Sequence, residues 1–154
     1  MKVVKAAAVF ILVYGLFSLS GVLFPVDREW YDALNKPSWT PTGKTIGIVW
    51  AVLFALIAAS ITRLHVKIGL RRLPFSVIFL LVLNYVLNQA FSYIQFDLKQ
   101  LFLAFLDCVL IAATCLLIIV ALKPLDNRAA YLYIPYFLWT CFASYLAWSI
   151  FSMN

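Results

Sequence analysis

The sequence predicts an all-α integral membrane protein, built as a bundle of five transmembrane helices. Of its 154 residues, 66% are hydrophobic and 12% are charged, and the mean hydropathy is +1.00. A soluble domain of this size does not need so much apolar surface. Four long segments carry no charged residue and a fifth carries one acid, Asp107. Each segment reaches the roughly 18–20 residues with which a helix crosses a bilayer core of about 30 Å. The predicted spans are 6–24, 45–62, 73–96, 100–122 and 129–152, which leaves a single domain, 1–154, and no residues for a second, soluble one.

The net charge of +6 does not indicate a nucleic-acid partner, because the basic residues gather at the ends of the predicted spans. Eight of the 12 Lys and Arg fall on one side of the membrane when the spans are taken in order; these are Lys2, Lys5, Arg63, Lys67, Arg71, Arg72, Lys123 and Arg128. The other four fall on the opposite side; these are Arg28, Lys36, Lys44 and Lys99. The excess of positive charge predicts a cytoplasmic N-terminus and an external C-terminus.

The span 6–24 follows a basic start, which also fits a removable signal peptide. Its apolar run is longer than the usual core of a signal peptide, and four more spans follow. We therefore predict a retained first helix. Gly15, Ser18 and Gly21 give one side of this helix small residues, which suit close helix contact.

The segment 25–44 is the longest polar stretch and holds Trp30–Gly43, WYDALNKPSWTPTG. Lys36-Pro37 and Thr40-Pro41 favour extended or turn geometry before each proline. Helix connections in bundles usually take about 2–8 residues, so a segment of this length is more than a connector. It is interpreted either as a lid over a cavity or as part of an aromatic belt at the membrane surface.

The span 45–62 carries Trp50 about one and a half turns inside its start, deeper than a surface belt. The basic loop 63–72 is expected to be solvated and to meet anionic headgroups. It holds the one histidine, His65, which is interpreted as a solvated residue rather than a haem or metal ligand. No metal site is predicted.

The span 73–96 carries a polar and aromatic stripe with helical spacing, consisting of Asn84, Asn88, Phe91, Ser92 and Gln95. Carboxamides facing lipid are costly, so this face is predicted to point into the bundle. Two uses remain open: hydrogen bonds to neighbouring helices, or the lining of a cavity.

The span 100–122 contains Asp107, and an acid inside a membrane span is a functional candidate by default. Two structural alternatives are a protonated carboxyl and a hydrogen bond to a carboxamide of the span 73–96, and a structural role is favoured. Without a second buried acid or a histidine to complete a proton relay, an ion pump is not indicated. Cys108, Cys115 and Cys141 lie within spans without metal-ligand spacing and are interpreted as packing residues.

The span 129–152 is aromatic along its length, and Pro135 is expected to loosen or kink it near its start. Trp139 and Ala143 share one face, where the small alanine leaves room beside the indole. A plain packing stripe is the alternative. The short connection 123–128 predicts that the last two spans are antiparallel neighbours.

Three motifs resemble those of one family, in the same order. WYDALNKPSWTPTG is similar to W-Y-x-x-L-x-K-P-x-W-x-P-P of the TspO/translocator-protein family, the tryptophan-rich sensory proteins of bacteria and their mitochondrial relative. LNQAFS, 87–92, resembles L-N-x-A-W-S, and PYFLWTCFASYL, 135–146, resembles P-Y-x-x-W-x-x-F-A-x-x-L. The loop positions that match are Trp30, Tyr31, Leu34, Lys36, Pro37, Trp39 and Pro41.

The chain departs from the family pattern at three positions. Phe91 replaces the usual Trp, Thr42 replaces the second Pro of the loop motif, and Ala147 stands where Asn is common. Mammalian members carry a cholesterol motif that ends in a basic residue near the C-terminus, but no Lys or Arg follows Arg128. Cholesterol binding through that motif is therefore not expected here.

The resemblance implies a five-helix bundle, usually a homodimer, with a cavity under the loop 25–44 and a bacterial plasma membrane as its location. Its implied ligands are porphyrins such as protoporphyrin IX, isoquinoline carboxamides and benzodiazepines, beside membrane lipid. The cavity would be lined by Tyr31, Trp50, Asn88, Trp139 and Ala143, with Phe91 nearby. The lid would be formed by Trp30, Lys36, Pro37, Trp39 and Pro41.

The resemblance also implies light-dependent oxidative degradation of protoporphyrin, with Trp50 and Trp139 as the catalytic residues. Such photochemistry needs no acid–base pair, no nucleophile and no resident cofactor. Two alternatives are a tetrapyrrole sensor without turnover and a transporter of tetrapyrroles or lipids. Transporters usually show internal repeats and broken helices near the middle of the membrane, and five helices do not divide into equal halves.

Overall fold

The computed structural model describes residues 2–154. All regular secondary structure in this part of the chain is helical, and the helices are joined by turns and loops. Five helical segments are long and apolar enough to cross a membrane, which confirms the predicted fold class. The helices are α1 (Lys2–Leu23), α2 (Arg28–Ala33), α3 (Gly43–Lys67), η1 (Leu70–Arg72), α4 (Phe75–Ser92), η2 (Tyr93–Asp97), α5 (Leu101–Leu122), α6 (Asn127–Leu132) and α7 (Ile134–Met153).

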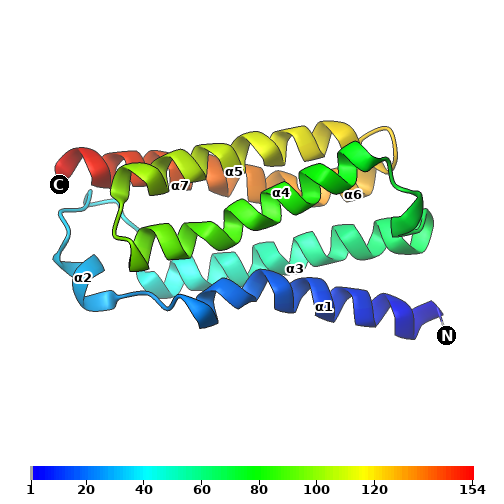
Figure 1. Cartoon of the computed structure of the whole chain (residues 1–154), viewed down its shortest axis with the longest axis horizontal. Coiled ribbons are helices and arrows are strands. Elements are labelled where there is room, and N and C mark those ends of the chain that lie inside the picture. The colour runs from blue at the N-terminus through cyan, green and yellow to red at the C-terminus, as the bar shows by residue number, and fades with distance from the viewer. Residues whose placement is uncertain (1) are drawn as a thin grey trace.

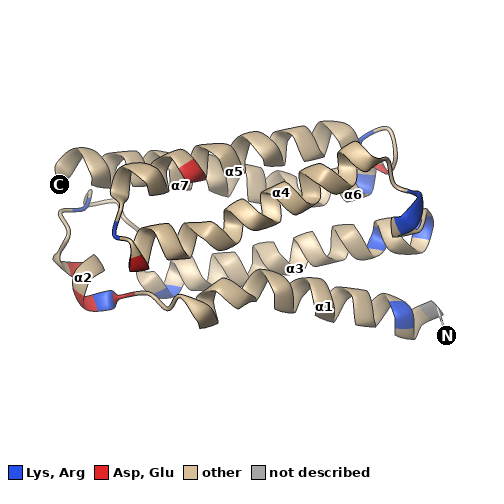
Figure 2. Ribbon diagram, in the orientation of Figure 1, with Lys and Arg blue, Asp and Glu red and all other residues tan. Residues whose placement is uncertain are grey.

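The long helices lie side by side in one elongated bundle (Figure 1), with the main contacts between α1 and α3, α4 and α5, and α5 and α7. The start of α1 lies at one end, whereas α2 and the C-terminus lie at the other. Charged residues gather at both ends of the bundle and leave the middle almost free of charge (Figure 2). This distribution is that of helices whose middle crosses hydrocarbon. Which end faces the cytoplasm stays a prediction.

The second long helix is longer than the apolar run that predicted it. α3 continues past position 62 through Arg63 to Lys67, so half of the predicted basic loop 63–72 belongs to α3, and η1 follows within the same loop. Both cations bind Asp126 from positions one turn apart. The helix therefore extends into the charged region because its last turn has a partner there.

The last span is divided into α6 and α7 at Tyr133, as the position of Pro135 predicted. Proline has no N–H to donate to the preceding turn, so it suits the first turn of a new helix. The break leaves the carbonyl of Tyr133 beside the Cys115 thiol, with 3.7 Å between sulfur and oxygen.

The segment 25–44 contains a short helix, α2, which the sequence analysis did not predict. Asp27 caps it, and its carboxylate accepts a hydrogen bond of 3.1 Å from the backbone N–H of Trp30. α3 then begins after Thr42, whose hydroxyl accepts from the N–H of Thr45. We call residues 25–42 the lid segment.

The core runs along the bundle axis, and α5 contributes the most buried of the spans. Its inward side is made of small and branched residues, namely Ala104, Cys108, Ile111, Ala112, Cys115, Ile118 and Leu122. Cys108 and Cys115 are buried packing residues, as predicted, whereas Cys141 is exposed on the outside of α7. Trp50, Phe91 and Trp139 are half-buried and pack against the core from the lid side.

Candidate functional site

The lid segment is held to other parts of the bundle at both of its halves. Asp27 forms an ion pair of 2.9 Å with Lys99, in the turn between η2 and α5, and the Lys99 ammonium lies 5.5 Å from the ring centre of Trp30. Asn35 and Asn154 exchange two hydrogen bonds of 3.0 and 2.9 Å between side-chain and backbone atoms. The lid is therefore attached to the α4–α5 turn and to the end of α7.

Trp39 attaches the second half of the lid through its ring. Its indole stacks on Tyr145 of α7, with ring centres 5.2 Å apart and planes 7° apart. It also packs edge-on against Phe142, at 5.9 Å. Pro37 and Pro41 stand on either side of it, and the carbonyl of Pro37 accepts hydrogen bonds from the backbone N–H and the hydroxyl of Thr40. The prolines thus hold a turn that presents Trp39 to α7.

Lys36 holds the first half of the lid together. Its ammonium donates to the backbone carbonyls of Tyr31, Asp32 and Leu34. It also lies 4.8 Å from the ring centre of Tyr31, within the range of a cation–π contact. The lysine that the family motif contains therefore closes the C-terminal end of α2 here.

A hollow of about 460 Å³ opens beside this segment, within the size range of small-molecule sites. Its walls are the lid itself and the start of α3; the lining residues are Tyr31, Asp32, Leu34, Lys36, Pro37, Thr40, Pro41, Thr42 and Gly43. We call it the lid hollow.

A row of aromatic rings leads from the lid into the bundle. Phe142, which touches Trp39, lies 5.2 Å from Trp139, centre to centre. Trp139 of α7 and Trp50 of α3 are perpendicular, with 6.5 Å between ring centres and 90° between planes. Trp50 then contacts Phe54 at 5.5 Å. The structure thus brings together the two tryptophans that the resemblance singled out, as an edge-to-face pair.

Trp139 carries a buried hydrogen-bond donor without a partner. Its Nε1–H is shielded from solvent and has no acceptor within the described residues. A buried donor that is left unpaired costs about 1–3 kcal/mol, and tryptophan N–H groups usually find a partner when buried. The site therefore contains one unsatisfied polar group on an otherwise aromatic wall.

Below this pair, the carboxamides of α4 bind neighbouring helices. Asn84 donates to the carbonyl of Ile111 at 3.1 Å and to the hydroxyl of Thr114 at 2.8 Å. The hydroxyl of Tyr136 donates to Asn84 at 3.1 Å and accepts from Asn88 at 3.2 Å. The inward direction of the stripe is confirmed, since Asn84, Asn88 and Gln95 are all buried. Asn84 serves as a link between α4, α5 and α7, whereas Asn88 lies at the upper end of the network, with one of its amide hydrogens bound to Tyr136.

The remaining predicted site residues lie around these groups. Tyr31 lines the lid hollow, and its ring packs edge-on against Phe96 at 6.1 Å. Phe91 is half-buried against the core on α4, and Ala143 is half-buried one turn after Trp139. Trp30 is half-buried beneath Lys99 rather than beside the tryptophan pair. The site is thus divided into a polar hollow in the lid and an aromatic wall below it.

Two groups of the lid segment, Asp27 and Tyr31, have pKa values that differ from their usual ones. The ammonium of Lys99 and the backbone N–H of Trp30 hold the pKa of Asp27 below its usual value. Burial, and to a smaller extent the charge of Asp32, raise the pKa of the Tyr31 phenol. Asp27 therefore remains a carboxylate that pairs with Lys99, and Tyr31 remains a neutral hydrogen-bonding group.

Asp107 has no hydrogen bond in the described structure. It is 5% exposed, and its Oδ2 is buried without a partner. Of the two structural alternatives, a hydrogen bond to a carboxamide of the span 73–96 is not formed in the described structure. Asn84 and Asn88 bind Ile111, Thr114 and Tyr136, and Gln89 binds the carbonyl of Phe17. No cluster of three or more His, Cys, Asp or Glu that could hold a metal ion occurs among residues 2–154.

Three residues that matter here escaped the sequence analysis. Tyr136 was counted among the aromatic residues of the last span, but its burial in the centre of the network depends on how α7 turns toward α4. Lys99 and Asn154 hold the lid from positions far away in the chain. Neither helical periodicity nor a local motif predicts these long-range contacts of Tyr136, Lys99 and Asn154.

Fold and site together define a class: integral membrane proteins of five helices, with a paired-tryptophan wall beneath a proline-stiffened lid. The model of the TspO/MBR family matches residues 6–153. The chain is 57% identical to a tryptophan-rich protein TspO of Bacillus cereus, over 95% of this chain and 94% of that protein. It is 50% identical to an uncharacterized membrane protein, YtaB, of Bacillus subtilis, over 99% and 98%. It is also 27% identical to the human translocator protein, over 91% and 83%.

The chain therefore belongs to the TspO/MBR family. This confirms the resemblance drawn from the three motifs. With five apolar helices of sufficient length, the protein is an integral membrane protein.

Proposed function

We propose that the protein binds flat, aromatic small molecules against the Trp50–Trp139 pair, with porphyrins such as protoporphyrin IX as the leading candidates. Isoquinoline carboxamides and benzodiazepines belong to the same shape class. The observation that carries the proposal is the buried Nε1–H of Trp139, which has no acceptor of its own. A guest that brings a carbonyl or carboxylate oxygen to this N–H satisfies it, while its flat body covers the rings.

The surroundings of the pair suit such a guest. Trp50 and Trp139 offer stacking worth about 0.5–1.5 kcal/mol per aromatic pair beyond burial. The small side chain of Ala143 limits the volume that α7 places beside Trp139, and Tyr31 lines the lid hollow. Asn88 has one amide hydrogen bound to Tyr136, which leaves its second one for a guest. Phe91 extends the apolar wall. A lid tied by Asp27, Asn35 and Trp39 opens and recloses as the guest enters.

The same arrangement supports light-dependent porphyrin oxidation. The excited porphyrin passes its energy to O2, and the excited O2 takes one electron from the indole of Trp50 or Trp139. The indole then takes one electron back from the porphyrin, which leaves an oxidised porphyrin and superoxide to combine, with the indole restored. O2 is the oxidant, and the two tryptophans act as electron carriers; no acid–base pair is required.

The experiment is a dark titration of the detergent-solubilised protein with protoporphyrin IX, followed by absorbance under illumination. Saturable quenching of tryptophan fluorescence reports binding, and decay of the porphyrin band faster than that of free porphyrin reports turnover. We expect Trp139→Phe to weaken binding about tenfold, because the N–H is lost while most of the ring is kept. Trp50→Phe with Trp139→Phe should abolish the decay.

Trp148→Phe is the matched control, since Trp148 lies further along α7, half exposed, against Phe105 and Phe151. It should leave both binding and decay unchanged. Saturable binding without protein-dependent decay would make the protein a sensor or carrier and remove the catalytic role of the tryptophans. If protoporphyrin does not bind at all, the proposal fails. We further propose a homodimer in a bacterial plasma membrane. The mass of the protein in the detergent-solubilised particle, without the contribution of the detergent, would test the dimer.

A further inference from the structure

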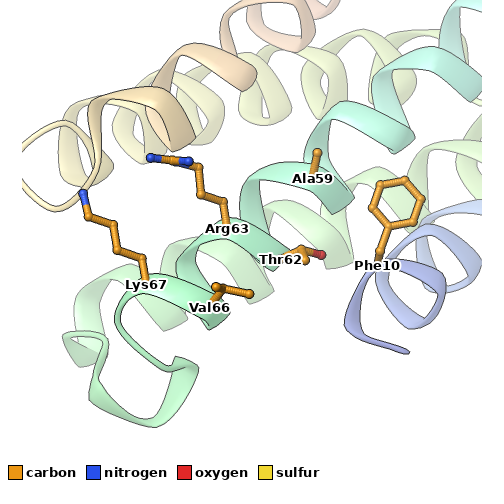
Figure 3. A pocket seen from close by; sticks show the side chains of 6 residues that line it. All are labelled: Phe10, Ala59, Thr62, Arg63, Val66 and Lys67. Atoms are coloured by element: carbon orange, nitrogen blue, oxygen red, sulfur yellow. The ribbon is translucent and has the colours of Figure 1, made fainter. Parts of the chain in front are cut away.

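A second hollow lies at the end of the bundle opposite the lid, between α1 and the last turns of α3 (Figure 3). Its volume is about 550 Å³. Phe10 of α1 and Ala59 and Val66 of α3 give it apolar walls, and Thr62, Arg63 and Lys67 complete the lining. We call it the α1–α3 hollow. It shares no lining residue with the lid hollow or the tryptophan pair, so it is a separate site.

Two cations of this hollow are only partly neutralised. Arg63 Nε lies 2.9 Å from one carboxylate oxygen of Asp126, and Lys67 Nζ lies 2.9 Å from the other. One carboxylate faces two cations, so one positive charge remains. The contact with Asp126 uses one of the five N–H groups of Arg63, whereas Lys67 meets the carboxylate as an ion pair. The Asp126 side chain is 1% exposed, whereas Arg63 and Lys67 are 37% and 53% exposed, so their free donors face outward.

The position of the hollow combines two environments. Ala59 belongs to the apolar part of α3, and Arg63 and Lys67 follow one and two turns later, where the span ends. Figure 3 shows Arg63 and Lys67 extending together from one side of α3, whereas Thr62 and Val66 point to the other side, toward Phe10. The hydroxyl of Thr62 has no hydrogen-bond partner within the described chain. Cations at the depth of headgroups therefore stand next to an apolar groove at the depth of acyl chains.

This juxtaposition selects among possible occupants. A free inorganic anion uses the cations but gains nothing from Phe10, Ala59 and Val66. A sterol or a neutral lipid uses the walls but gains nothing from the residual charge. An anionic phospholipid uses both, because a phosphate is a strong acceptor for Arg and Lys and its acyl chain fills the groove. The concentration of basic residues at this end adds a longer-range attraction for anionic lipid (Figure 2).

We propose that the α1–α3 hollow binds one anionic phospholipid, with its phosphate on Arg63 and Lys67 and an acyl chain along Phe10, Ala59 and Val66. The lipid lies against both α1 and α3, and it does not depend on the ligand bound beneath the lid.

Native mass spectrometry of the detergent-solubilised protein with phosphatidylglycerol or phosphatidylcholine of identical chains tests the proposal. We expect phosphatidylglycerol to bind about tenfold more tightly, as one retained bound lipid. Ala59→Leu fills the groove and leaves the ion pairs intact, so it should weaken phosphatidylglycerol binding about tenfold. Lys67→Gln should weaken it by a similar factor.

The double variant Arg71→Gln, Arg72→Gln is the matched control, because it removes two exposed charges at the same end that do not line the hollow. It should change the affinity less than about twofold. Equal affinity for the two lipids would overturn the charge assignment. A larger effect of the Arg71, Arg72 variant than of Ala59→Leu would show a diffuse basic surface and overturn the site, as would full displacement of the lipid by millimolar inorganic phosphate. Unchanged helical circular dichroism checks that Ala59→Leu is folded.

Discussion

Two acids of this protein are almost equally buried, but one is surrounded by cations and N–H groups and the other has no hydrogen-bond partner. Asp126 is 3% exposed at the end of the bundle away from the lid, and Asp107 is 5% exposed within the span of α5. Asp126 contacts Arg63 and Lys67 and accepts hydrogen bonds from the backbone N–H groups of Arg128 and Ala129. Asp107 has no hydrogen bond in the described structure.

The comparison shows that burial by itself does not say what an acid contributes. The carboxylate of Asp126 closes the N-terminal end of α6 and ties it to α3, where Ser60 donates to the carbonyl of Ala129 at 2.8 Å. It is thus a structural link between α3 and the start of α6. Asp107 links nothing, so its presence costs free energy that the rest of the bundle offsets. The same Asp→Asn substitution at both sites distinguishes the two situations.

The largest effect is expected for Asp126→Asn. The amide keeps the shape but loses the charge that two cations and two N–H groups bind, and hydrogen bonds to charged groups contribute about 1.5–3 kcal/mol. We expect the free energy of unfolding to fall by about 2–3 kcal/mol, measured by denaturant titration in detergent micelles. Asp32→Asn, at an exposed acid of α2, is the control and should be neutral. An unchanged Asp126→Asn protein would mean that these ion pairs contribute no more than surface ones.

Lowering the pH should reproduce this effect without a mutation. Hydrogen bonds and ion pairing, first of all with Arg63, lower the pKa of Asp126 in the folded protein. In the unfolded chain an aspartate has a pKa of about 3.9. A carboxyl whose folded pKa is lowered contributes its full stability above the unfolded pKa and loses it as the pH falls toward the folded value.

We therefore expect the difference in unfolding free energy between wild type and Asp126→Asn to be constant from about pH 5 to 7 and to shrink below about pH 4. Parallel denaturant titrations across this range measure it. A difference that stays constant down to pH 3 would show that it does not come from the charge of the Asp126 carboxylate.

The smallest effect is expected for Asp107→Asn. No hydrogen bond is lost, and a carboxyl that is costly to bury is replaced by a neutral group of similar size. We expect the free energy of unfolding to stay the same or to rise by up to about 1 kcal/mol, under the conditions used for Asp126→Asn. A loss as large as that of Asp126→Asn would reveal a partner for Asp107 and would remove the contrast between the two acids.

The number and approximate extent of the spans could be predicted because lipid imposes long charge-free segments on a chain. The end of α3 could not, because Arg63 and Lys67 look like loop residues until Asp126 is known to bind them. The short helix α2 was missed although Asp27, three residues before Trp30, is an ordinary N-cap signal.

The inward direction of Asn84 and Asn88 followed from helical periodicity, since polar groups avoid lipid. Their partners did not follow, because Tyr136 and Thr114 reach them only through the way in which α4, α5 and α7 turn toward one another. The contact between Trp50 and Trp139 depends in the same way on the packing of α3 against α7. The motifs named both residues through the family, but no spacing along one helix predicts a perpendicular pair across two.

The three thiols of this chain differ in their access to reagents. Cys108 and Cys115 are buried, whereas Cys141 is exposed on α7, two residues after Trp139. Because α7 lies within a membrane span, Cys141 faces lipid or detergent, whereas Cys108 and Cys115 pack inside the bundle. A label at Cys141 stands on the helix that carries Trp139 and Tyr145, the stacking partner of Trp39. Cys141 is thus a position for a reporter group on the outer side of α7, the helix whose inner side carries Trp139 and would meet the ligand.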